Sequence, residues 1–256
     1  MPSIIWFRDD LRLADNPALT AACTHDQVIP IYIHDTSNIV PSDGSAANVW
    51  RFHSLMALNA DLEHRLQFFV GDPRQILPQL CADWDVQCVY ANTAHTPEGQ
   101  ALDRDITKQL QTQSVDVQLS LGHLLWDPTH VTKDDGTPYK VFTPYYRKGC
   151  LLHVDAPRKP LPRPRNIPLA APPSTLACPL TADPFFSSSA TWPSTLMHTW
   201  TVGEQAALTQ LKSFLSHGIE HYKDGRNFPA KPYTSRLSAY LKHGEITPHI
   251  IWVAFT

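Results

Sequence analysis

Short apolar segments alternate with longer amphipathic segments from residue 3 to about residue 120 of this 256-residue chain. Five of the short segments have the length and the β-branched or aromatic content of strands: residues 4–7, 28–33, 67–70, 86–90 and 115–119. Between them, residues 50–66 and 74–84 carry apolar side chains at helical spacing. Strands that alternate with helices predict a five-stranded parallel sheet with helices on both faces, a Rossmann-like, doubly wound α/β domain.

A sheet of this kind binds its ligands beyond the carboxyl ends of its strands. We therefore expect a ligand site in the loops that follow Phe7, Ile33 and Tyr90. The ten glycines form no G-x-G pair, and the sequence contains no Walker loop. The α/β domain is therefore not predicted to be a conventional NAD or ATP domain.

The segment from residue 157 to residue 193 differs from its surroundings, because it holds ten of the chain's 23 prolines. Proline fixes φ and lacks an N–H group, so this segment predicts a surface linker rather than a long helix or a central strand. Residues 140–165 also hold seven basic side chains and one acidic side chain. Two interpretations stay open for this basic stretch: a solvated linker, or a surface that attracts a polyanion.

The pattern becomes helical again from Thr201 onward. Residues 201–204 have the form of a capping box, and apolar side chains then follow at spacings of three and four. A second helix is predicted from Thr234, whose hydroxyl would cap it, to Gly244. A third helix is predicted to begin at Thr247, which precedes a proline.

These patterns divide the chain into an α/β domain (residues 1–130), a linker (131–200, proline-rich from 157) and the beginning of an all-α domain (201–256). With 43% hydrophobic and 18% charged residues, the composition is typical of a soluble globular protein. No apolar run of membrane-spanning length and no leader pattern is present, so we expect a cytoplasmic protein without a membrane partner. The five cysteines and thirteen histidines form no metal-binding pattern, so we expect no bound metal.

Three segments resemble the DNA photolyase and cryptochrome family. Residues 6–19 (WFRDDLRLADNPAL) are similar to the family's opening signature almost residue for residue. Residues 139–145 (YKVFTPY) resemble the segment that closes its α/β domain, and residues 222–238 resemble the start of its helical flavin domain. We identify the sequence as a member that resembles class I bacterial deoxyribodipyrimidine photolyases and that ends inside the flavin domain.

The resemblance implies a deoxyribodipyrimidine photo-lyase, a carbon–carbon lyase that repairs cyclobutane pyrimidine dimers in DNA by light-driven electron transfer from reduced FAD. Because the cofactor carries the chemistry, no catalytic side chain is expected, and the isolated chain is expected to be inactive. The implied protein is a monomer whose partner is dimer-containing DNA. One alternative is a cryptochrome-type blue-light photoreceptor without repair activity. Another is a nucleotide-binding module related to electron-transfer flavoproteins.

The resemblance also implies site residues. The expected FAD contacts are Tyr222, Thr234, Ser235, Arg236, Leu237 and Ser238. Two hydroxyls at the start of a predicted helix would also suit a pyrophosphate on physical grounds. Arg226 is expected to contact DNA phosphate, for which a planar fork of donors is well shaped.

The charged residues of the opening signature have two interpretations. Arg8, Asp10, Arg12 and Asp15 either hold a loop through charge-assisted hydrogen bonds, which we favour, or contact an antenna pigment. The resemblance is compatible with a second chromophore, a folate or a deazaflavin. Folate-binding members carry an Asn-Glu pair after the fourth strand, whereas this chain has Glu98-Gly99, which argues against folate.

Overall fold

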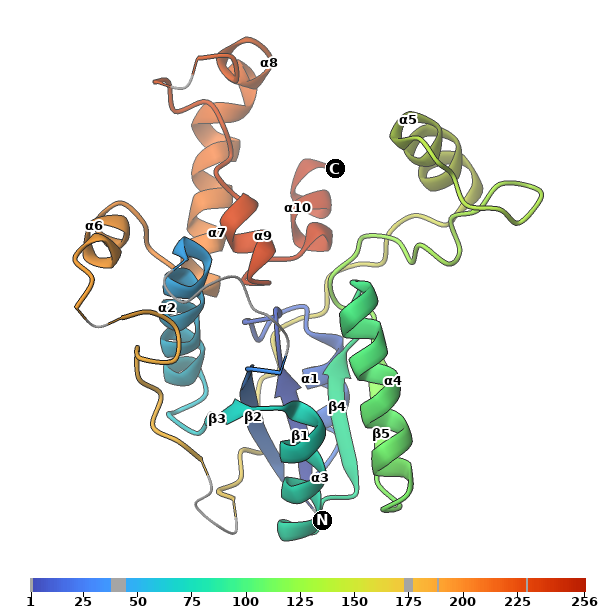
Figure 1. Ribbon diagram of the computed structural model, residues 1–256. Helices are drawn as coiled ribbons and strands as arrows, with labels where there is room; N and C mark the ends of the chain where they lie inside the picture. The colour runs from blue at the N-terminus through green and yellow to red at the C-terminus, as the bar shows by residue number, and fades with distance from the viewer. Residues whose placement is uncertain (1, 38–44, 173–176, 188, 229) are drawn as a thin grey trace.

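The computed structural model describes residues 2–37, 45–172, 177–187, 189–228 and 230–256. Within them, five parallel strands form a sheet in the order β3-β2-β1-β4-β5 (Figure 1). The strands are β1 (Ser3–Phe7), β2 (Val28–Asp35), β3 (Gln67–Gly71), β4 (Cys88–Asn92) and β5 (Asp116–Ser120). The predicted five-stranded parallel sheet is therefore confirmed.

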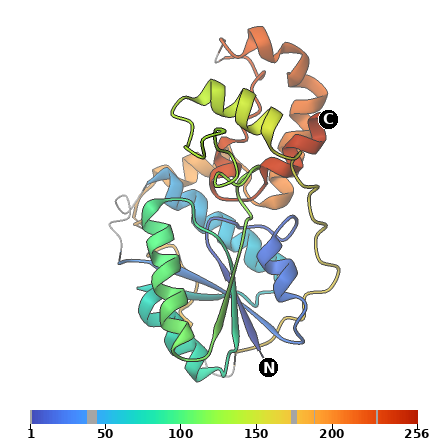
Figure 2. The ribbon, with the colours of Figure 1, turned by 90° about the vertical axis from the view of Figure 1, so that its right-hand side faces the viewer.

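Successive residues of each strand point to opposite faces of the sheet, and each face has its own core. Ile5 and Phe7 of β1 pack with helices α1 (Pro17–Ala22) and α2 (Ala46–Asp61). Ile4 and Trp6 pack with helices α3 (Pro73–Asp83) and α4 (Pro97–Gln111) on the other face. Figure 2 shows these helices on both sides of the sheet, the arrangement of a doubly wound domain.

The element boundaries differ from the predicted ones for local reasons. Strand β4 begins at Cys88, two residues later than predicted, because Cys88 is the first residue of β4 that pairs with β1. Helix α2 begins four residues earlier than predicted, because the Ser45 hydroxyl accepts a hydrogen bond from the Asn48 N–H at 3.2 Å and caps the helix. It ends before His64, whose φ of +60° is incompatible with a right-handed helix.

The chain leaves the sheet after β5 as a projecting arm. The arm carries helix α5 (Phe142–Pro144) and the π-helix η1 (Tyr145–His153) (Figure 1). The chain then returns along the α/β domain, where Leu169 bridges Val28 and the side chain of Phe185 is fully buried in the core beside α2. The described part of residues 160–190 contains no helix, as predicted, although the domain boundaries themselves stay a prediction.

The last part of the chain is helical and packs on α2. Its elements are α6 (Trp192–His198), α7 (Glu204–Ser213), the π-helix η2 (Phe214–Gly218), the 3-10 helix η3 (Ile219–His221), α8 (Tyr222–Gly225), α9 (Ser238–Lys242) and α10 (Pro248–Phe255). Trp50 of α2 joins Leu211, Leu237 and Tyr240 in a third core. This core fixes the helical segment against the α/β domain.

One of the three predicted helix starts is confirmed and two are wrong. The Thr247 hydroxyl accepts from the Ile250 N–H at 3.1 Å, so α10 begins as predicted. The predicted capping box is absent, because α7 begins with Gly203 at the N-cap and the Glu204 side chain bonds elsewhere. Helix α9 begins at Ser238 rather than Thr234, because Arg236 has a φ of +54° and interrupts any right-handed helix.

Candidate functional site

The opening signature forms a hydrogen-bonded loop at the carboxyl end of β1. Arg8 forms an ion pair with Asp103 of α4 at 2.5 Å and also donates a hydrogen bond to the carbonyl oxygen of Asn92. The Asn92 side-chain amide in turn donates to Asp10 at 2.5 Å. These bonds tie the loop after β1 to the end of β4 and to α4.

Arg12 extends this network to the helical segment. Its guanidinium, which is 1% exposed, donates to the carbonyl oxygens of Asp15, Gly122 and Gly244 at 2.9, 2.7 and 2.9 Å. Burial lowers the pKa of Arg12, while Asp10 and Asp15 act in the opposite direction. A buried cation is costly unless it is paired and hydrogen-bonded. Three carbonyl oxygens supply the hydrogen bonds of Arg12, and they join the loop after β1 to Gly122 and Gly244, which are distant in sequence.

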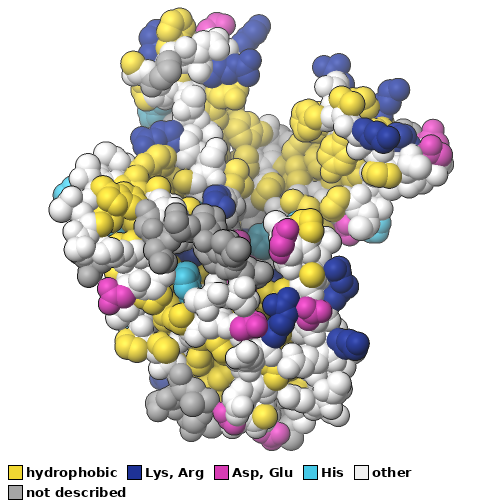
Figure 3. Space-filling model, viewed as in Figure 1, with side chains coloured by type: hydrophobic (Ala, Val, Ile, Leu, Met, Phe, Trp, Pro, Cys, Tyr) yellow, Lys and Arg dark blue, Asp and Glu magenta, His cyan; other side chains and the backbone are white. Residues whose placement is uncertain are grey.

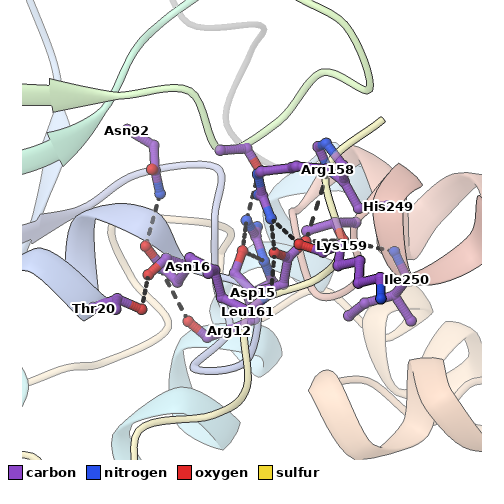
Figure 4. Close-up of polar contacts among 12 residues, drawn as sticks. Arg12, Asp15, Asn16, Thr20, Asn92, Arg158, Lys159, Leu161, His249 and Ile250 are labelled. Carbon is purple, nitrogen blue, oxygen red and sulfur yellow. Dashed lines mark hydrogen bonds and ion pairs between the residues drawn. The ribbon is translucent and has the colours of Figure 1, made fainter. Parts of the chain in front are cut away.

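The Asp15 carboxylate also connects the loop after β1 to distant parts of the chain (Figure 4). It accepts from Arg158 and from the Leu161 N–H in the linker, and from the Thr247 hydroxyl at the start of α10. Burial acts to raise the pKa of Asp15, but the hydrogen bonds from Arg158 and Thr247 outweigh it, so the pKa lies below its ordinary value. The favoured interpretation of the signature as a loop-holding motif is therefore confirmed for Arg12 and Asp15.

Two carboxylates of the helical segment accept hydrogen bonds from residues of the α/β domain. Glu204 accepts from the backbone N–H groups of Leu13 and Ala14 at 2.8 and 3.0 Å. Glu245 is fully buried and accepts from the Trp50 indole at 2.8 Å and the Ser54 hydroxyl at 2.5 Å, both on α2. Burial raises the pKa of Glu245, although its hydrogen bonds oppose this. The α/β domain and the helical segment thus each supply ionisable side chains whose hydrogen-bond partners lie in the other part.

A cavity of about 530 Å³ opens at the carboxyl ends of β1, β2 and β4. Its walls include Arg8 after β1, His34 at the end of β2 and His95 after β4, together with Lys242 of α9. The expected position of a ligand site after Phe7, Ile33 and Tyr90 therefore coincides with a cavity. Its volume lies in the range of roughly 300–1,000 Å³ typical of small-molecule sites. We call it the sheet-end cavity.

The walls of the sheet-end cavity carry polar atoms without partners. Six buried side-chain nitrogen or oxygen atoms in the described residues lack a hydrogen bond, and four of them belong to residues that line this cavity. These four are Trp6 Nε1, Arg51 Nε, Asn92 Oδ1 and His95 Nε2. Buried polar groups are normally paired, so the residues around this cavity hold hydrogen-bonding capacity that the rest of the described chain does not use.

Two histidines face the same cavity. The rings of His95 and His123 meet edge to face, with centroids 6.0 Å apart. Burial lowers the pKa of both imidazoles, so both are neutral near pH 7. The sequence analysis did not select either residue, and the only signal available was that His95 follows an apolar strand. Neutral imidazoles and an indole provide a wall that is suited to a planar, polar ring.

The expected FAD contacts lie at the start of α8, which holds Tyr222, and in the segment that leads into α9 at Ser238. Phe214 meets the Tyr222 ring at 5.9 Å between centroids, and it lines a cavity of about 330 Å³ together with Thr234 and Arg236. The Arg236 guanidinium lies over the Trp200 ring at 3.9 Å. The residues Thr234, Arg236 and Ser238 are exposed, whereas Ser235 is half-buried and Leu237 is buried. Because α9 begins at Ser238, Thr234 and Ser235 do not lie at a helix N-terminus.

The remaining cations divide into internal and external groups. Arg158 is paired with the buried Asp15, so this part of the basic stretch serves the fold, whereas Arg163 forms only a solvent-exposed pair with Asp61 at 3.4 Å. Arg226 is exposed, and its guanidinium lies 5.8 Å from the centroid of the Tyr222 ring. Figure 3 shows Lys and Arg side chains at the outer ends of both projections, the α5–η1 arm and the α7–α8 helices. Hydrophobic side chains cover much of the remaining surface of these projections.

In the described ranges, no group of three or more His, Cys, Asp or Glu side chains is arranged to hold a metal ion. Among the helices of the same residues, none is long and apolar enough to cross a membrane.

The fold places the chain among doubly wound α/β proteins with a ligand cavity at the carboxyl edge of the sheet. Its sequence matches the family described as DNA photolyase over residues 3–165, and the chain belongs to that family.

Named relatives extend this similarity to the helical segment. The chain is 37% identical over 259 residues to deoxyribodipyrimidine photo-lyase of Agrobacterium fabrum, a match that covers 99% of the chain and 53% of that enzyme. It is 32% identical to a Synechococcus protein described as an uncharacterized 31.6 kDa protein, and here the match covers 98% of the chain and 88% of the relative. The chain thus spans about half the length of the Agrobacterium enzyme and most of the shorter relative.

Solved structures agree with these matches. The crystal structure of a bacterial class III photolyase from Agrobacterium tumefaciens is similar with a TM-score of 0.88 and 35% identity, over 99% of this chain and 52% of that one. A Synechocystis cryptochrome matches with a TM-score of 0.83 over 99% of this chain and 55% of its own, but at 23% identity it shows the fold alone. The resemblance to class I photolyases stays a prediction.

Proposed function

We propose that this chain forms the antenna-binding domain and the first part of the flavin domain of a DNA-repair photolyase, and that the whole protein repairs cyclobutane pyrimidine dimers. The observation that carries the proposal is the 37% identity to a deoxyribodipyrimidine photo-lyase across both the α/β domain and the helical segment. When bound, reduced FAD supplies the electron that splits the dimer. The residues of this chain bind and orient the chromophores and the DNA.

The proposed flavin site rests on Phe214 and its surroundings. The Tyr222 ring contacts the Phe214 ring, and Phe214 and Thr234 line the same cavity. A dinucleotide bound beside Phe214 would therefore meet hydroxyl groups from two chain segments. The exposed hydroxyls of Thr234 and Ser238 are free to accept or donate to phosphate oxygens. The donor set therefore fits FAD, with Arg236, Leu237 and Ser235 completing the segment.

The proposed DNA contact is Arg226. It follows directly after α8, the outer helix of the α7–α8 projection (Figure 1), and Lys223 within α8 and Lys231 are also exposed. A group of cations on one projecting end attracts phosphates, and the arginine fork can bind one phosphate with two donors. These features support DNA with pyrimidine dimers as the partner of the whole protein.

The sheet-end cavity is the proposed antenna site. Its unpaired polar atoms and neutral imidazoles suit a planar, hydrogen-bonding chromophore such as a folate or a deazaflavin. A chromophore in this cavity would absorb light and pass the excitation energy to a flavin held by the helical segment. The two sites are connected through α9, which contributes Leu241 and Lys242 to the cavity wall.

A second candidate function is that of a cryptochrome, a photoreceptor that does not repair DNA. It is favoured by the 27% identity over 259 residues to cryptochrome-2 of Arabidopsis thaliana, a match that covers 96% of this chain and 41% of that protein. The two candidates differ in whether illumination splits a pyrimidine dimer.

The test is a chimera in which residues 1–256 replace the corresponding half of the Agrobacterium fabrum enzyme. We expect it to bind flavin stoichiometrically and to repair dimer-containing oligonucleotides under blue light but not in the dark. A chimera that contains full flavin, binds the oligonucleotide and leaves the dimers intact would favour the cryptochrome candidate and contradict repair.

A further inference from the structure

The Arg236 side chain lies against an aromatic ring beside the proposed flavin segment, residues 234–238. Its guanidinium carbon is 3.9 Å from the centroid of the Trp200 ring. Arginine stacks on aromatic faces in this way, and the attraction between the cation and the ring adds to the packing. Arg236 forms no ion pair within the described ranges, so the Trp200 ring is the partner that the structure gives to this charge.

The Trp200 ring is itself held by two other aromatic rings. Trp50 of α2 and Tyr240 of α9 meet it edge to face, with centroids 5.1 and 6.2 Å away. The Tyr240 hydroxyl also donates to the carbonyl oxygen of Thr201, the residue after Trp200, at 2.7 Å. Trp200 is half-buried and packs on the third core. Arg236 therefore rests on a ring that this core keeps in place.

A hydrogen bond from α7 holds the same segment. The Gln210 side-chain amide donates to the Ser235 carbonyl oxygen at 2.9 Å. Gln210 and Arg236 both line two cavities: one of about 520 Å³ that Trp200 also lines, and the cavity of about 330 Å³ that Thr234 lines. Trp200 lines only the first of these two. Gln210 and Arg236 therefore connect Trp200 to the cavity beside the expected cofactor contacts.

The backbone of the flavin segment depends on such contacts. Arg236 has a φ of +54°, in the left-handed region that residues with a side chain rarely adopt. A glycine would adopt this conformation more easily. An arginine at this position is therefore stabilised by the contacts that its side chain makes. The same conformation directs the chain into α9, which begins two residues later at Ser238.

We propose that Trp200 and Gln210 are positioning residues for the flavin: they hold Arg236 and Ser235 and so fix the shape of residues 234–238 before the cofactor binds. In this arrangement the Arg236 side chain serves the site by stacking on Trp200 and does not bind the cofactor phosphate. This inference rests on the proposed flavin site and adds to it two residues outside the expected FAD contacts.

The expected effect of positioning is on affinity. A segment that is held in its binding conformation binds more tightly than one that must first be ordered. If the segment keeps this conformation for only a fraction of the time, the apparent dissociation constant rises in inverse proportion to that fraction. Loss of the Trp200–Arg236 contact should therefore weaken flavin binding although Trp200 itself does not line the cavity of about 330 Å³.

The test uses the chimera with the Agrobacterium fabrum enzyme, which is freed of flavin and titrated with FAD. Arg236→Gln and Trp200→Leu should each raise the dissociation constant of FAD by about three- to tenfold, because the unliganded segment no longer keeps one conformation. The conservative variant Trp200→Phe retains an aromatic face and should stay within about twofold of the unmodified chimera. Trp192→Leu changes an exposed tryptophan of α6 that lines neither cavity, and it should have no effect.

Two further measurements separate positioning from a direct contact with the phosphate. Amide hydrogen exchange of Ser235 and Leu237, measured without FAD, should be faster in Arg236→Gln and in Gln210→Met than in the unmodified chimera. The double variant of Trp200→Leu and Arg236→Gln should bind FAD about as weakly as either single variant, because both changes remove the same contact. Since Arg236 is exposed, Arg236→Gln keeps the fold and tests the proposal even where Trp200→Leu does not fold.

Three outcomes would overturn the inference. An unchanged FAD affinity in Arg236→Gln would show that the stacked pair does not position the segment, and the flavin site would stand without it. Losses of affinity that add in the double variant, together with unchanged exchange in the absence of FAD, would show that Arg236 binds the phosphate directly. An unmodified chimera that binds no FAD would overturn the proposed flavin site and the inference together.

Discussion

Gly244 lies directly against the backbone of Asp9. A Cβ atom on Gly244 would come within 2.0 Å of the Asp9 carbonyl oxygen, and Gly244 also has a φ of +66°. A residue with a side chain fits neither the contact nor the dihedral angle. Because the Gly244 carbonyl oxygen also accepts from Arg12, this glycine allows the helical segment to reach the loop after β1.

Gly244→Ala should therefore lower the free energy of unfolding by about 2–4 kcal/mol, as measured by urea denaturation. Gly136→Ala is the matched control, since Gly136 has a φ of +77° but no atom within 4 Å of an added Cβ. It should cost only about 1 kcal/mol, the usual cost of a left-handed non-glycine residue. Equal losses in the two variants would show that the close approach to Asp9 is not a constraint.

Asp15→Asn should destabilise the protein at neutral pH by about 1–3 kcal/mol. The NH₂ group of asparagine is a donor, so it would face the donor of Arg158 or Thr247 at a place where the carboxylate accepts. The folded-state pKa of Asp15 is lowered, so its carboxylate stabilises the fold above the unfolded-state pKa. This contribution is lost as the pH falls through the folded-state pKa. The difference between wild type and variant should be full at pH 7 and shrink below about pH 4. A difference that is constant over this range would contradict the ionised pairing.

The role of Glu204 can be separated from a local helix cap. Glu204→Ala should lower the free energy of unfolding by about 1–3 kcal/mol, because two N–H groups of the β1–α1 loop lose their acceptor. Thr201→Ala should change it by no more than about 0.5 kcal/mol, since Thr201 is exposed and does not cap α7. Thermal unfolding of the two variants is the measurement. A large loss of stability in Thr201→Ala would contradict this and would support the capping box at Thr201.

Arg226→Ala in the chimera with the Agrobacterium fabrum enzyme should weaken DNA binding equally for all sequences. It should also reduce the dependence of binding on salt by about one phosphate contact. Fluorescence anisotropy of a labelled oligonucleotide at several salt concentrations measures both effects. Flavin content, measured by absorbance, should not change. An unaltered salt slope would remove Arg226 from the DNA surface.

The isolated 256-residue chain should hold FAD poorly and repair nothing. Phe142 and Leu152 on the arm are 73% and 75% exposed, and Val253 and Phe255 of α10 are each 48% exposed. Apolar surface of this extent favours mobility or aggregation. We expect weak FAD binding and fast amide exchange in α10, measured by titration and by mass spectrometry. Stoichiometric flavin together with measurable repair of dimer-containing DNA would contradict this expectation.

The sheet was predictable because buried parallel strands appear as apolar runs whatever surrounds them. Ile4 and Ile5, for example, point to opposite cores, so both positions are apolar. Helix ends were less predictable, because they depend on contacts distant in sequence. Glu204 has the spacing of a capping box, yet its carboxylate bonds to Leu13 and Ala14, 190 residues or more away. Hydrogen bonds to residues distant in sequence thus take the place of a local helix cap at Glu204.

The candidate site was predictable only in part. The loops beyond the strands could be named from the order of the elements, whereas Arg226 and Tyr222 stay predictions from the resemblance to the family. Arg51, His123 and Lys242 could not be selected, because they come from α2, the segment after β5 and α9, which meet only in the folded chain. Nothing in their sequence neighbourhoods distinguishes them from ordinary surface residues.

The separation of 232 residues between Asp15 and Thr247 has a consequence for the nascent chain. A ribosome completes all five strands before it reaches Thr247, and domains generally fold as they emerge. The two sheet cores can therefore close while the Asp15 carboxylate still lacks a donor and Arg12 still lacks the carbonyl group of Gly244. The loop after β1 would acquire its last partners only when α9 and α10 have been made. The sheet-end cavity, which needs Lys242 for its wall, is thus completed only after α9 has been made, and a chromophore would find a complete site only after translation has passed this point.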